Sequence, residues 1–523
     1  MRRRDWIKST AAGVAGSSII NSAINSARGD VPDHLWQGYD FGPGPKAADR
    51  LNQGPFGIEQ DEGWYTIATT TPAQGPVRNF GLGLVGYTWE EGGPSLAARR
   101  GAETIEQHVE NLASLPFVDV LYIRCDWRDV QKSPGRLDLH PIWKLTLDAA
   151  QQHGLRVAFR IQLSSPNIQP GRLSMPDFVR ESVPLVKIGR RPPTAEFEFI
   201  EPRYDAPEFQ KAFRELNELL AAEFDHNPLM EFVDLMMYGF WGEGHTGDLP
   251  SPFPDYLTAE RTFVQMTRLQ IETWKQTALA VNTQPDIGKT GNREVQDIAV
   301  RSGCWLRSDS VVLDEPLQIE ELAHRPPWLA VVMEDGRYRH YDVDQLAVDG
   351  SGMNPLESTI LHVLDVGANY WSLWTEGASL KRYHEKYPRG LQALQQRLGY
   401  RVRPSWIWQR KRYGTSELVI AFANDGVSGV PGILRISVQG RDFAFERSGS
   451  LDAGHPHAGR LRLASFMMPP GLEGREVKLR AEVETKGGIR RPIRWACAQP
   501  VELDGSIVIR LKSLSDPDWR KGV

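Results

Sequence analysis

The feature that most constrains the fold is an alternation of short apolar segments with amphipathic ones between residues 82 and 374. The apolar segments are rich in β-branched residues, as buried parallel strands are. Between them, apolar residues recur at spacings of three and four, which predicts helices. The eight predicted strands are 82–89, 118–127, 155–163, 232–241, 277–282, 302–311, 328–335 and 367–374.

The short linkers favour one arrangement of these units. In residues 148–160 a helix, a glycine C-cap at Gly154 and a buried strand follow each other almost directly, as in a βα barrel. Eight units in this length predict an α/β fold, a (β/α)8 TIM barrel with insertions. An open doubly wound sheet is the alternative, although no G-x-G-x-x-G motif follows the first strand.

Residues 1–29 resemble a bacterial twin-arginine export signal. Arg3 and Arg4 come shortly before Trp6, which stands where phenylalanine is usual, and a mildly apolar run rich in Ala, Gly and Ser follows. We predict cleavage near Ala27 and a periplasmic or extracellular protein; a disordered basic N-terminus is the alternative. No later stretch approaches about eighteen uninterrupted apolar residues, so no membrane span is expected.

The remaining chain divides by composition. Residues 30–79 are rich in Gly, Pro, Asp and Gln and predict an extended wrap before a barrel domain over 80–382. Residues 383–413 predict a helix and linker. In residues 414–523, short alternating strands separated by Gly, Pro and Asp predict an antiparallel β-sandwich.

Composition excludes some partners. With 41% hydrophobic and 24% charged residues the chain should fold, and a net charge of −5 with scattered basic residues gives no reason to expect nucleic-acid binding. Cys125, Cys304 and Cys497 fit no metal-ligand spacing and allow at most one disulfide, and we expect none. No metal or cofactor is expected, and the oligomeric state stays open.

In a barrel of this kind the functional surface lies at the C-terminal ends of the strands. Carboxylates, arginines and tryptophans concentrate at the predicted ends, where a polar, ring-shaped substrate such as a carbohydrate would bind. The candidate substrate-binding residues are Arg124, Trp127, Arg160, Trp241, Asn282, Asp309, Trp371 and Trp374.

Two glutamates at these ends suggest a reaction. Glu243 and Glu334 end the fourth and seventh predicted strands, so their side chains should face each other across the barrel mouth. Two carboxyl groups that flank a glycosidic bond hydrolyse it when one donates a proton to the leaving oxygen and the other attacks the anomeric carbon or activates water. Gly242 and Gly244 permit a sharp turn at Glu243.

Residues 80–380 resemble the superfamily of (β/α)8-barrel retaining glycoside hydrolases called clan A. The segments FWGEGH (240–245), VVMED (331–335) and NYWSLW (369–374) stand where these enzymes carry the acid/base glutamate, the nucleophilic glutamate and a tryptophan. Residues 126–161 resemble the second βα unit of family 42 beta-galactosidases. The resemblance implies a retaining β-glycosidase with Glu243 as acid/base and Glu334 as nucleophile.

The chain departs from that superfamily at Gly242, where asparagine usually contacts the sugar 2-hydroxyl. This departure motivates a second hypothesis, a non-catalytic carbohydrate-binding barrel protein. A metal-dependent deacetylase is a third, against which the absence of clustered His and Asp residues argues. Sugar, linkage and endo or exo action cannot be read from the sequence.

Structural roles compete for the same residues. Glu243 is also compatible with a charged residue in a turn at the start of a helix. Glu334 is also compatible with a solvated residue in a hairpin turn, and in that case Glu376 is the alternative nucleophile. Trp371 and Trp374 should point to opposite faces of one strand, so at most one lines the cavity, and Trp371 would otherwise pack in the core. Arg124 and Arg160 would bind substrate or orient the glutamates.

Overall fold

The computed structural model describes most of the chain from Trp64 onward. The described ranges are 64–90, 93–94, 103–165, 173–190, 198–283, 292–308, 320, 322–334, 355–373, 380–381, 384–385, 388–412, 415–451 and 462–513. The predicted export signal and residues 30–63 of the predicted wrap lie outside them, as do three candidate site residues, Asp309, Trp374 and Glu376.

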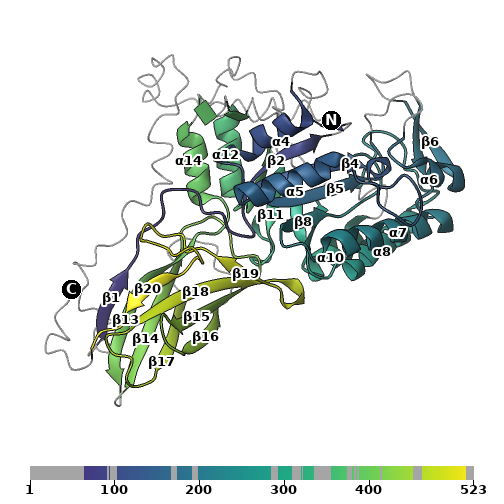
Figure 1. Ribbon diagram of the computed structural model, residues 1–523. Helices are drawn as coiled ribbons and strands as arrows, with labels where there is room; N and C mark the ends of the chain where they lie inside the picture. The colour runs from purple at the N-terminus through teal and green to yellow at the C-terminus, as the bar shows by residue number, and fades with distance from the viewer. Residues whose placement is uncertain are drawn as a thin grey trace, which may run out of the picture.

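Eight parallel strands close into a (β/α)8 barrel, as predicted (Figure 1). Each strand pairs with its neighbour in chain order, and the last strand, β12, pairs with the first, β2, which closes the ring. The strands are β2 (Gly83–Glu90), β4 (Val120–Asp126), β5 (Arg156–Gln162), β8 (Met230–Asp234), β9 (Ala278–Asn282), β10 (Trp305–Ser308), β11 (Val331–Glu334) and β12 (Tyr370–Leu373). The short β3 (Gly93–Pro94) pairs antiparallel with β2.

Helices alternate with these strands, and their ends follow local sequence signals. Thr104 and Gln107 form a capping box at the first of them, and Gly154 ends the second at φ 65°, as the sequence predicted. The described helices of the barrel region are α4 (Ile105–Ala113), α5 (Pro141–His153), α6 (Asp177–Ser182), α7 (Pro207–Phe224), α8 (Tyr256–Thr273), α10 (Asn292–Arg301), α12 (Pro355–Asp365) and α14 (Pro388–Arg397).

One strand differs from its prediction in a way that matters for the site. The fourth barrel strand was expected over 232–241, but β8 ends at Asp234. The apolar run continues beyond the strand because Leu235, Met236 and Met237 are buried in a non-strand segment that leaves the barrel. Glu243 therefore lies on a loop nine positions beyond the strand, whereas Glu334 is the last residue of β11.

Strand alternation divides the barrel into an outer layer and a lumen. Outward residues such as Leu84, Phe159 and Met333 join the helices in one hydrophobic cluster. The inward residues at the start of the strands form an apolar floor, whereas those nearer the strand ends are polar or charged. The floor residues are Val85, Val120, Tyr122, Ala158, Phe232, Ala280, Trp305, Val332 and Tyr370.

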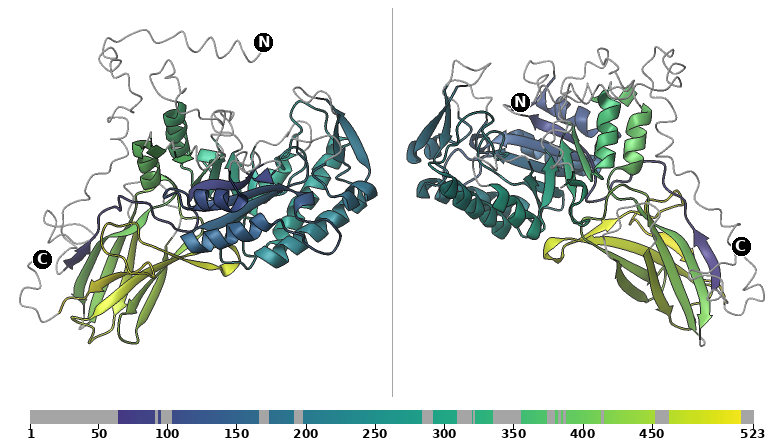
Figure 2. Two further views of the ribbon diagram at one scale, coloured as in Figure 1. Left: turned by 45° about the horizontal axis from the view of Figure 1, so that its top comes forward. Right: turned by 180° about the vertical axis from the view of Figure 1, so that it is seen from behind.

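The second region consists of two antiparallel sheets beneath the barrel (Figure 2). One has the order β1-β13-β14-β17; in the other, β16, β15 and β18 pair in turn, and β19 and β20 both pair with β18. The strands are β1 (Trp64–Thr69), β13 (Val402–Arg412), β14 (Thr415–Asn424), β15 (Ile433–Gly440), β16 (Glu446–Leu451), β17 (Arg462–Met468), β18 (Glu476–Glu484), β19 (Arg490–Ile493) and β20 (Ile507–Arg510). A separate hairpin pairs β6 (Leu185–Gly189) with β7 (Phe199–Pro202).

Two strands of this region lie where other structure was expected. β13 occupies the last third of residues 383–413, the segment predicted as helix and linker, and β1, from the predicted wrap, pairs antiparallel with it. Pro404 and the charged end of β13 obscure its alternation in the sequence, and a bulge between Pro404 and Trp406 shifts its register. Neither strand can be recognised without its partner.

Candidate active site

Six charged side chains form a closed ring in the upper lumen of the barrel. Arginines and carboxylates alternate around it, three of each, so the ring carries no net charge. In order, its members are Asp234, Arg160, Glu243, Arg124, Glu334 and Arg307, with Arg307 returning to Asp234. All six side chains are at least 97% buried.

The strongest contacts hold the two glutamates that the sequence singled out. Arg160 Nη1 lies 2.6 Å from Glu243 Oε1, and Arg307 Nη2 lies 2.6 Å from Glu334 Oε2. Arg124 Nη1 lies between them, 3.1 Å from Glu334 Oε1 and 3.7 Å from Glu243 Oε1. Arg124 and Arg160 therefore orient the glutamates, the second of the two roles considered for them.

Asp234 closes the ring on the far side. Its Oδ2 lies 3.2 Å from Arg307 Nη1 and 3.4 Å from Arg160 Nε, and it accepts a hydrogen bond from the Tyr122 hydroxyl. Charges this deeply buried are tolerated only when each is paired and hydrogen-bonded, which the alternation provides. Removing one member would leave its neighbours as uncompensated buried charges.

Two tyrosines of the lumen remain protonated donors to this ring. Burial, and then the negative charge of Glu334, raises the pKa of Tyr87 well above its ordinary value. Burial and Asp234 do the same for the pKa of Tyr122. The Tyr87 hydroxyl lies 3.3 Å from Glu334 Oε1, so Glu334 receives hydrogen bonds from a phenol as well as from Arg124 and Arg307.

Glu243 is carried by a loop with unusual backbone geometry. Residues 239, 242, 244 and 247 are glycines with φ between 61° and 82°, and Trp241 is the only non-glycine residue with positive φ in the described chain, at 57°. The Phe240 N–H donates to the His245 carbonyl oxygen at 2.7 Å, so the loop folds back on itself. A Cβ on Gly239 would overlap that same oxygen, which is why glycine is needed there.

The loop also places partners on both sides of Glu243. Asn282 donates its amide to the Glu243 carbonyl oxygen at 2.9 Å and so fixes the backbone at the end of β9. His245 Nε2 lies 3.4 Å from Glu243 Oε2, on the side away from Arg160. The Gly247 N–H donates to His245 Nδ1 at 3.1 Å, which assigns the proton of the neutral imidazole to Nε2, facing Glu243.

The two glutamates are close enough to act on one bond. Because Arg124 Nη1 lies 3.7 Å from Glu243 Oε1 and 3.1 Å from Glu334 Oε1, these two oxygens are separated by at most the sum of those distances, about 6.8 Å. Retaining glycosidases separate their carboxyl groups by about 5 to 5.5 Å and inverting ones by about 6.5 to 9.5 Å. Distances up to this limit of about 6.8 Å include the whole range of retaining enzymes and only the lower edge of the range of inverting ones.

Two tryptophans expected to bind substrate have other surroundings. Trp127 packs against Phe178 and Phe209, and its indole N–H donates to Gln131 at 2.8 Å. Trp371 belongs to the outer cluster shared with the helices, because its neighbours Tyr370 and Ser372 point into the lumen. The expected sugar platform at Trp371 is therefore wrong, and core packing, its alternative, is what the structure shows.

Some lumen groups remain available to a ligand. Both polar atoms of the Gln162 side chain, the Asn282 Oδ1 and the Trp241 Nε1 are buried without a hydrogen-bond partner in the described chain. Buried polar groups are rarely left unpaired unless a ligand or water satisfies them. Of the predicted tryptophans that the structure describes, Trp241 is the one whose ring contacts His245.

The sequence did not identify two members of the ring, Asp234 and Arg307, or the neighbouring Tyr87. Asp234 was hidden inside an overlong predicted strand, although a carboxylate within an apolar run was a usable signal. Arg307 and Tyr87 lie within predicted strands but had no predicted role, because which side chains point inward depends on the exact strand register. Asp309, Trp374 and the alternative nucleophile Glu376 lie outside the described residues, so they stay predictions.

Two features are absent from the described ranges. No group of three or more His, Cys, Asp or Glu residues there has an arrangement able to hold a metal ion. No helix there is both long and apolar enough to cross a membrane.

Comparison with known proteins gives structural likenesses only. No protein-family profile and no curated protein sequence matches the chain. Among solved structures, the catalytic domain of beta-amylase from Paenibacillus polymyxa aligns with a TM-score of 0.36 at 10% identity, over 56% of this chain and 92% of that one. Endo-glycoceramidase II from Rhodococcus sp. aligns with a TM-score of 0.36 at 11% identity, over 85% and 99%.

A third likeness is to the exo-beta-1,4-mannosidase Op5Man5 from Opitutaceae bacterium strain TAV5, with a TM-score of 0.34 at 13% identity over 62% of this chain and 57% of that one. TM-scores and identities this low assign no activity, so the function is argued from the site.

Proposed function

We propose that the protein is a glycoside hydrolase that cleaves O-glycosidic bonds of poly- or oligosaccharides with retention of configuration. The observation that carries the proposal is the charge ring, which holds Glu243 and Glu334 within about 6.8 Å of each other through the shared Arg124. A pair of carboxyl groups at this separation is what a two-step displacement at an anomeric carbon requires.

Glu334 has the surroundings of the nucleophile. Its carboxylate accepts hydrogen bonds from Arg124, Arg307 and the Tyr87 hydroxyl, which fix its orientation for attack. In the first step a carboxylate oxygen of Glu334 attacks the anomeric carbon and the bond to the leaving oxygen breaks. The second step replaces the glycosyl ester with a bond to water and returns Glu334 to its starting state.

Glu243 supplies the proton in the first step and removes one from water in the second. Its Oε1 is engaged by Arg160, so Oε2, which faces His245, is the oxygen that exchanges the proton. The Asn282 contact to its backbone keeps the carboxyl group in place between the two steps.

The charge balance of the ring favours a neutral sugar as the substrate. Each of the three arginines contacts two carboxylates, so none is free to bind an acidic group of a uronic acid or sulfated glycan. The unpaired amide of Gln162 instead offers a donor and an acceptor to sugar hydroxyls, and Asn282 Oδ1 offers an acceptor.

Single substitutions of the two glutamates test the proposal. Glu334→Gln keeps the shape but cannot attack, so we expect turnover of a matched panel of aryl β-glycosides to fall by roughly 10⁴-fold or more. Glu243→Gln should abolish hydrolysis of substrates with poor leaving groups and largely spare the first step of dinitrophenyl glycosides, which need no acid. Glu218→Gln, at an exposed position of α7, is the control, and wild-type rates in both glutamate variants would reject the proposal.

A non-catalytic carbohydrate-binding protein is the second candidate. It is favoured by Arg160, because a guanidinium 2.6 Å from Glu243 stabilises the ionised form of that carboxyl group and not the acid that cleavage needs. Gly242 in place of asparagine points the same way. Calorimetric titration that shows saturable oligosaccharide binding without release of reducing ends would support this candidate.

The finer assignments are part of the proposal. β-Specificity and membership of family 42 rest on sequence resemblance alone. Export through the twin-arginine pathway to the periplasm or the outside rests on residues 1–29. The antiparallel sheets are proposed to form one sandwich, because their facing residues share a hydrophobic cluster.

A further inference from the structure

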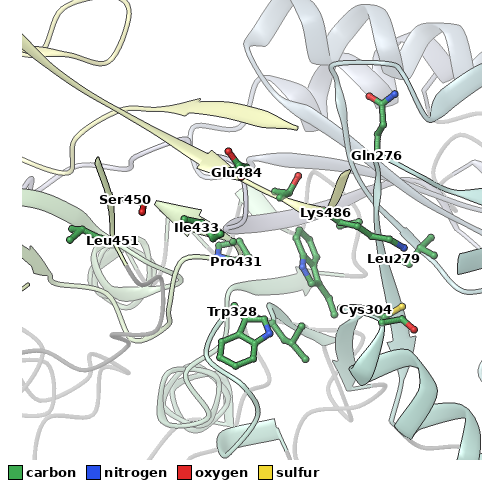
Figure 3. A pocket seen from close by; sticks show the side chains of 17 residues that line it. Gln276, Leu279, Cys304, Trp328, Pro431, Ile433, Ser450, Leu451, Glu484 and Lys486 are labelled. Atoms are coloured by element: carbon green, nitrogen blue, oxygen red, sulfur yellow. The ribbon is translucent and has the colours of Figure 1, made fainter. Parts of the chain in front are cut away.

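A cavity lies at the opposite end of the barrel from the charge ring. It has a volume of about 560 Å³ and opens between the first residues of β9 and β10, the residues just before β11, and the sheet that contains β15, β16 and β18 (Figure 3). Cavities of roughly 300 to 1,000 Å³ at domain junctions are the usual sites for small ligands. We call it the junction pocket.

The walls of the junction pocket are mostly apolar. Its inner surface is formed by aliphatic and aromatic residues from both regions, among them Leu279, Trp305, Leu329, Pro431 and Leu451. Trp328 and Ile433 also line it, yet their side chains are 54% and 44% exposed. No other described tryptophan is among the large apolar side chains exposed to this degree.

The charges at the pocket are unbalanced. Of its two charged lining residues, Glu484 is already neutralised by Arg435 at 2.8 Å and Arg490 at 3.0 Å. Lys486 has no carboxylate within 4.0 Å in the described ranges; its Nζ contacts only the Ile271 carbonyl oxygen at 3.4 Å. Figure 3 shows Trp328 on one side of the cavity and Glu484 and Lys486 on the other. The cavity therefore combines an apolar interior with an unpaired cation at its edge.

The pocket is preformed by contacts of the turn between β18 and β19. Gly487, at φ 73°, approaches the barrel so closely that an added Cβ would lie 2.8 Å from the Lys275 carbonyl oxygen. Nearby, Arg491 Nη1 donates to the Pro228 carbonyl oxygen at 3.0 Å. Because these contacts hold the turn against the barrel, a ligand need not create the cavity, and little binding energy is spent on closure.

We propose that the junction pocket binds an amphiphilic organic anion, with an aromatic or aliphatic body against Trp328, Leu329 and Ile433 and an acidic group at Lys486. Charge complementarity and the apolar walls together select this class. A neutral sugar would leave both the cation and the aliphatic walls unused. The proposal does not depend on the reaction at the charge ring.

Two dyes that differ in charge test the proposal on the full-length protein. Anilinonaphthalene sulfonate carries an aromatic body and a sulfonate, and N-phenylnaphthylamine has the same aromatic body without the charge. We expect saturable fluorescence enhancement with both dyes, and tighter binding of the sulfonate by roughly two- to fivefold, the worth of one exposed ion pair.

Two variants then locate the site. Lys486→Gln should remove the preference for the sulfonate and leave the neutral dye unaffected, whereas Trp328→Ala should weaken both dyes by about tenfold through lost apolar contact. Leu503→Ala, at a fully exposed apolar residue outside the pocket, is the control for general dye binding. Unchanged affinity of both dyes in both pocket variants, with unaltered thermal unfolding, would overturn the proposal. A loss of dye affinity in the pocket variants no larger than the loss in Leu503→Ala would overturn it as well.

Discussion

At the scale of single residues, the site depends on what surrounds each oxygen of Glu243. Arg160 contacts Oε1, and His245 faces Oε2 with a proton that the Gly247 N–H assigns to Nε2. The His245 side chain is 16% exposed, whereas those of the ring members are almost fully buried. His245 is thus a positioning residue for Glu243.

His245→Ala tests this role by kinetics. Without the imidazole beside Oε2 the Glu243 carboxyl group is held less firmly, so kcat should fall by roughly tenfold with little change in KM. His245→Gln, which keeps a polar group at this position, should restore part of kcat. An unchanged kcat would contradict the role of His245 alone, while wild-type rates in Glu243→Gln would contradict the proposed function itself.

At the scale of elements, the loop that carries Glu243 is supported from below by the β6–β7 hairpin. Tyr204 accepts a hydrogen bond from the Gly239 N–H at 3.0 Å and donates one to Glu201, which also accepts one from Ser164. Burial raises the pKa of Glu201 to about 7, although the hydrogen bonds from Ser164 and Tyr204 oppose the shift. A fully buried carboxyl group therefore lies directly beneath the loop.

The raised pKa makes a prediction about stability. The folded protein binds the Glu201 proton more tightly than the unfolded chain does, so protonation of Glu201 stabilises the folded state. This stabilisation is complete below pH 4.5, the ordinary pKa of glutamate, and is lost as the pH rises through about 7. The loss should amount to about 3 kcal/mol in the free energy of unfolding. Urea unfolding at several pH values measures how the free energy of unfolding depends on pH. Glu201→Gln should remove this dependence, whereas Glu198→Gln on the same hairpin should keep it. An equal pH dependence in the wild type and both variants would contradict the prediction.

At the scale of the whole molecule, the barrel and the antiparallel sheets share one core. The apolar floor of the barrel continues into the facing residues of β14, β15 and β18. Asn369, before β12, connects the two regions: its amide donates to the Gly81 and Gly429 carbonyl oxygens, and its Oδ1 accepts from Ser428. Arg325 adds contacts to the Gly367 carbonyl oxygen and to Ser428.

Asn369→Ala should therefore destabilise both regions together. Several buried backbone and side-chain groups would lose their partner, at about 1 to 3 kcal/mol each before relaxation. Calorimetry should show a single unfolding transition in the wild type. The variant should also show a single transition, with a lower midpoint temperature. Two separate transitions in the wild type would show instead that barrel and sheets unfold independently.

The sequence by itself determined the order of the barrel strands and the pair of glutamates. Short apolar runs, helical apolar spacings of three and four, and caps such as Gly154 are local properties, and they were sufficient to place all eight strands in the right order. Glu243 stood out because its glycines mark a turn that few other residues allow. These signals act within a few positions and need no partner.

The tertiary structure alone decided which side chains meet. A shift of one residue along a strand reverses which side chains point into the barrel. Trp371 therefore lies outside the site, whereas Asp234 and Arg307 belong to it. Charges around a closed barrel come from strands more than 200 residues apart, and no local pattern relates Arg124 to Glu334. The β1–β13 pairing and the junction pocket arise the same way, from contacts between segments that carry no sequence signal for each other.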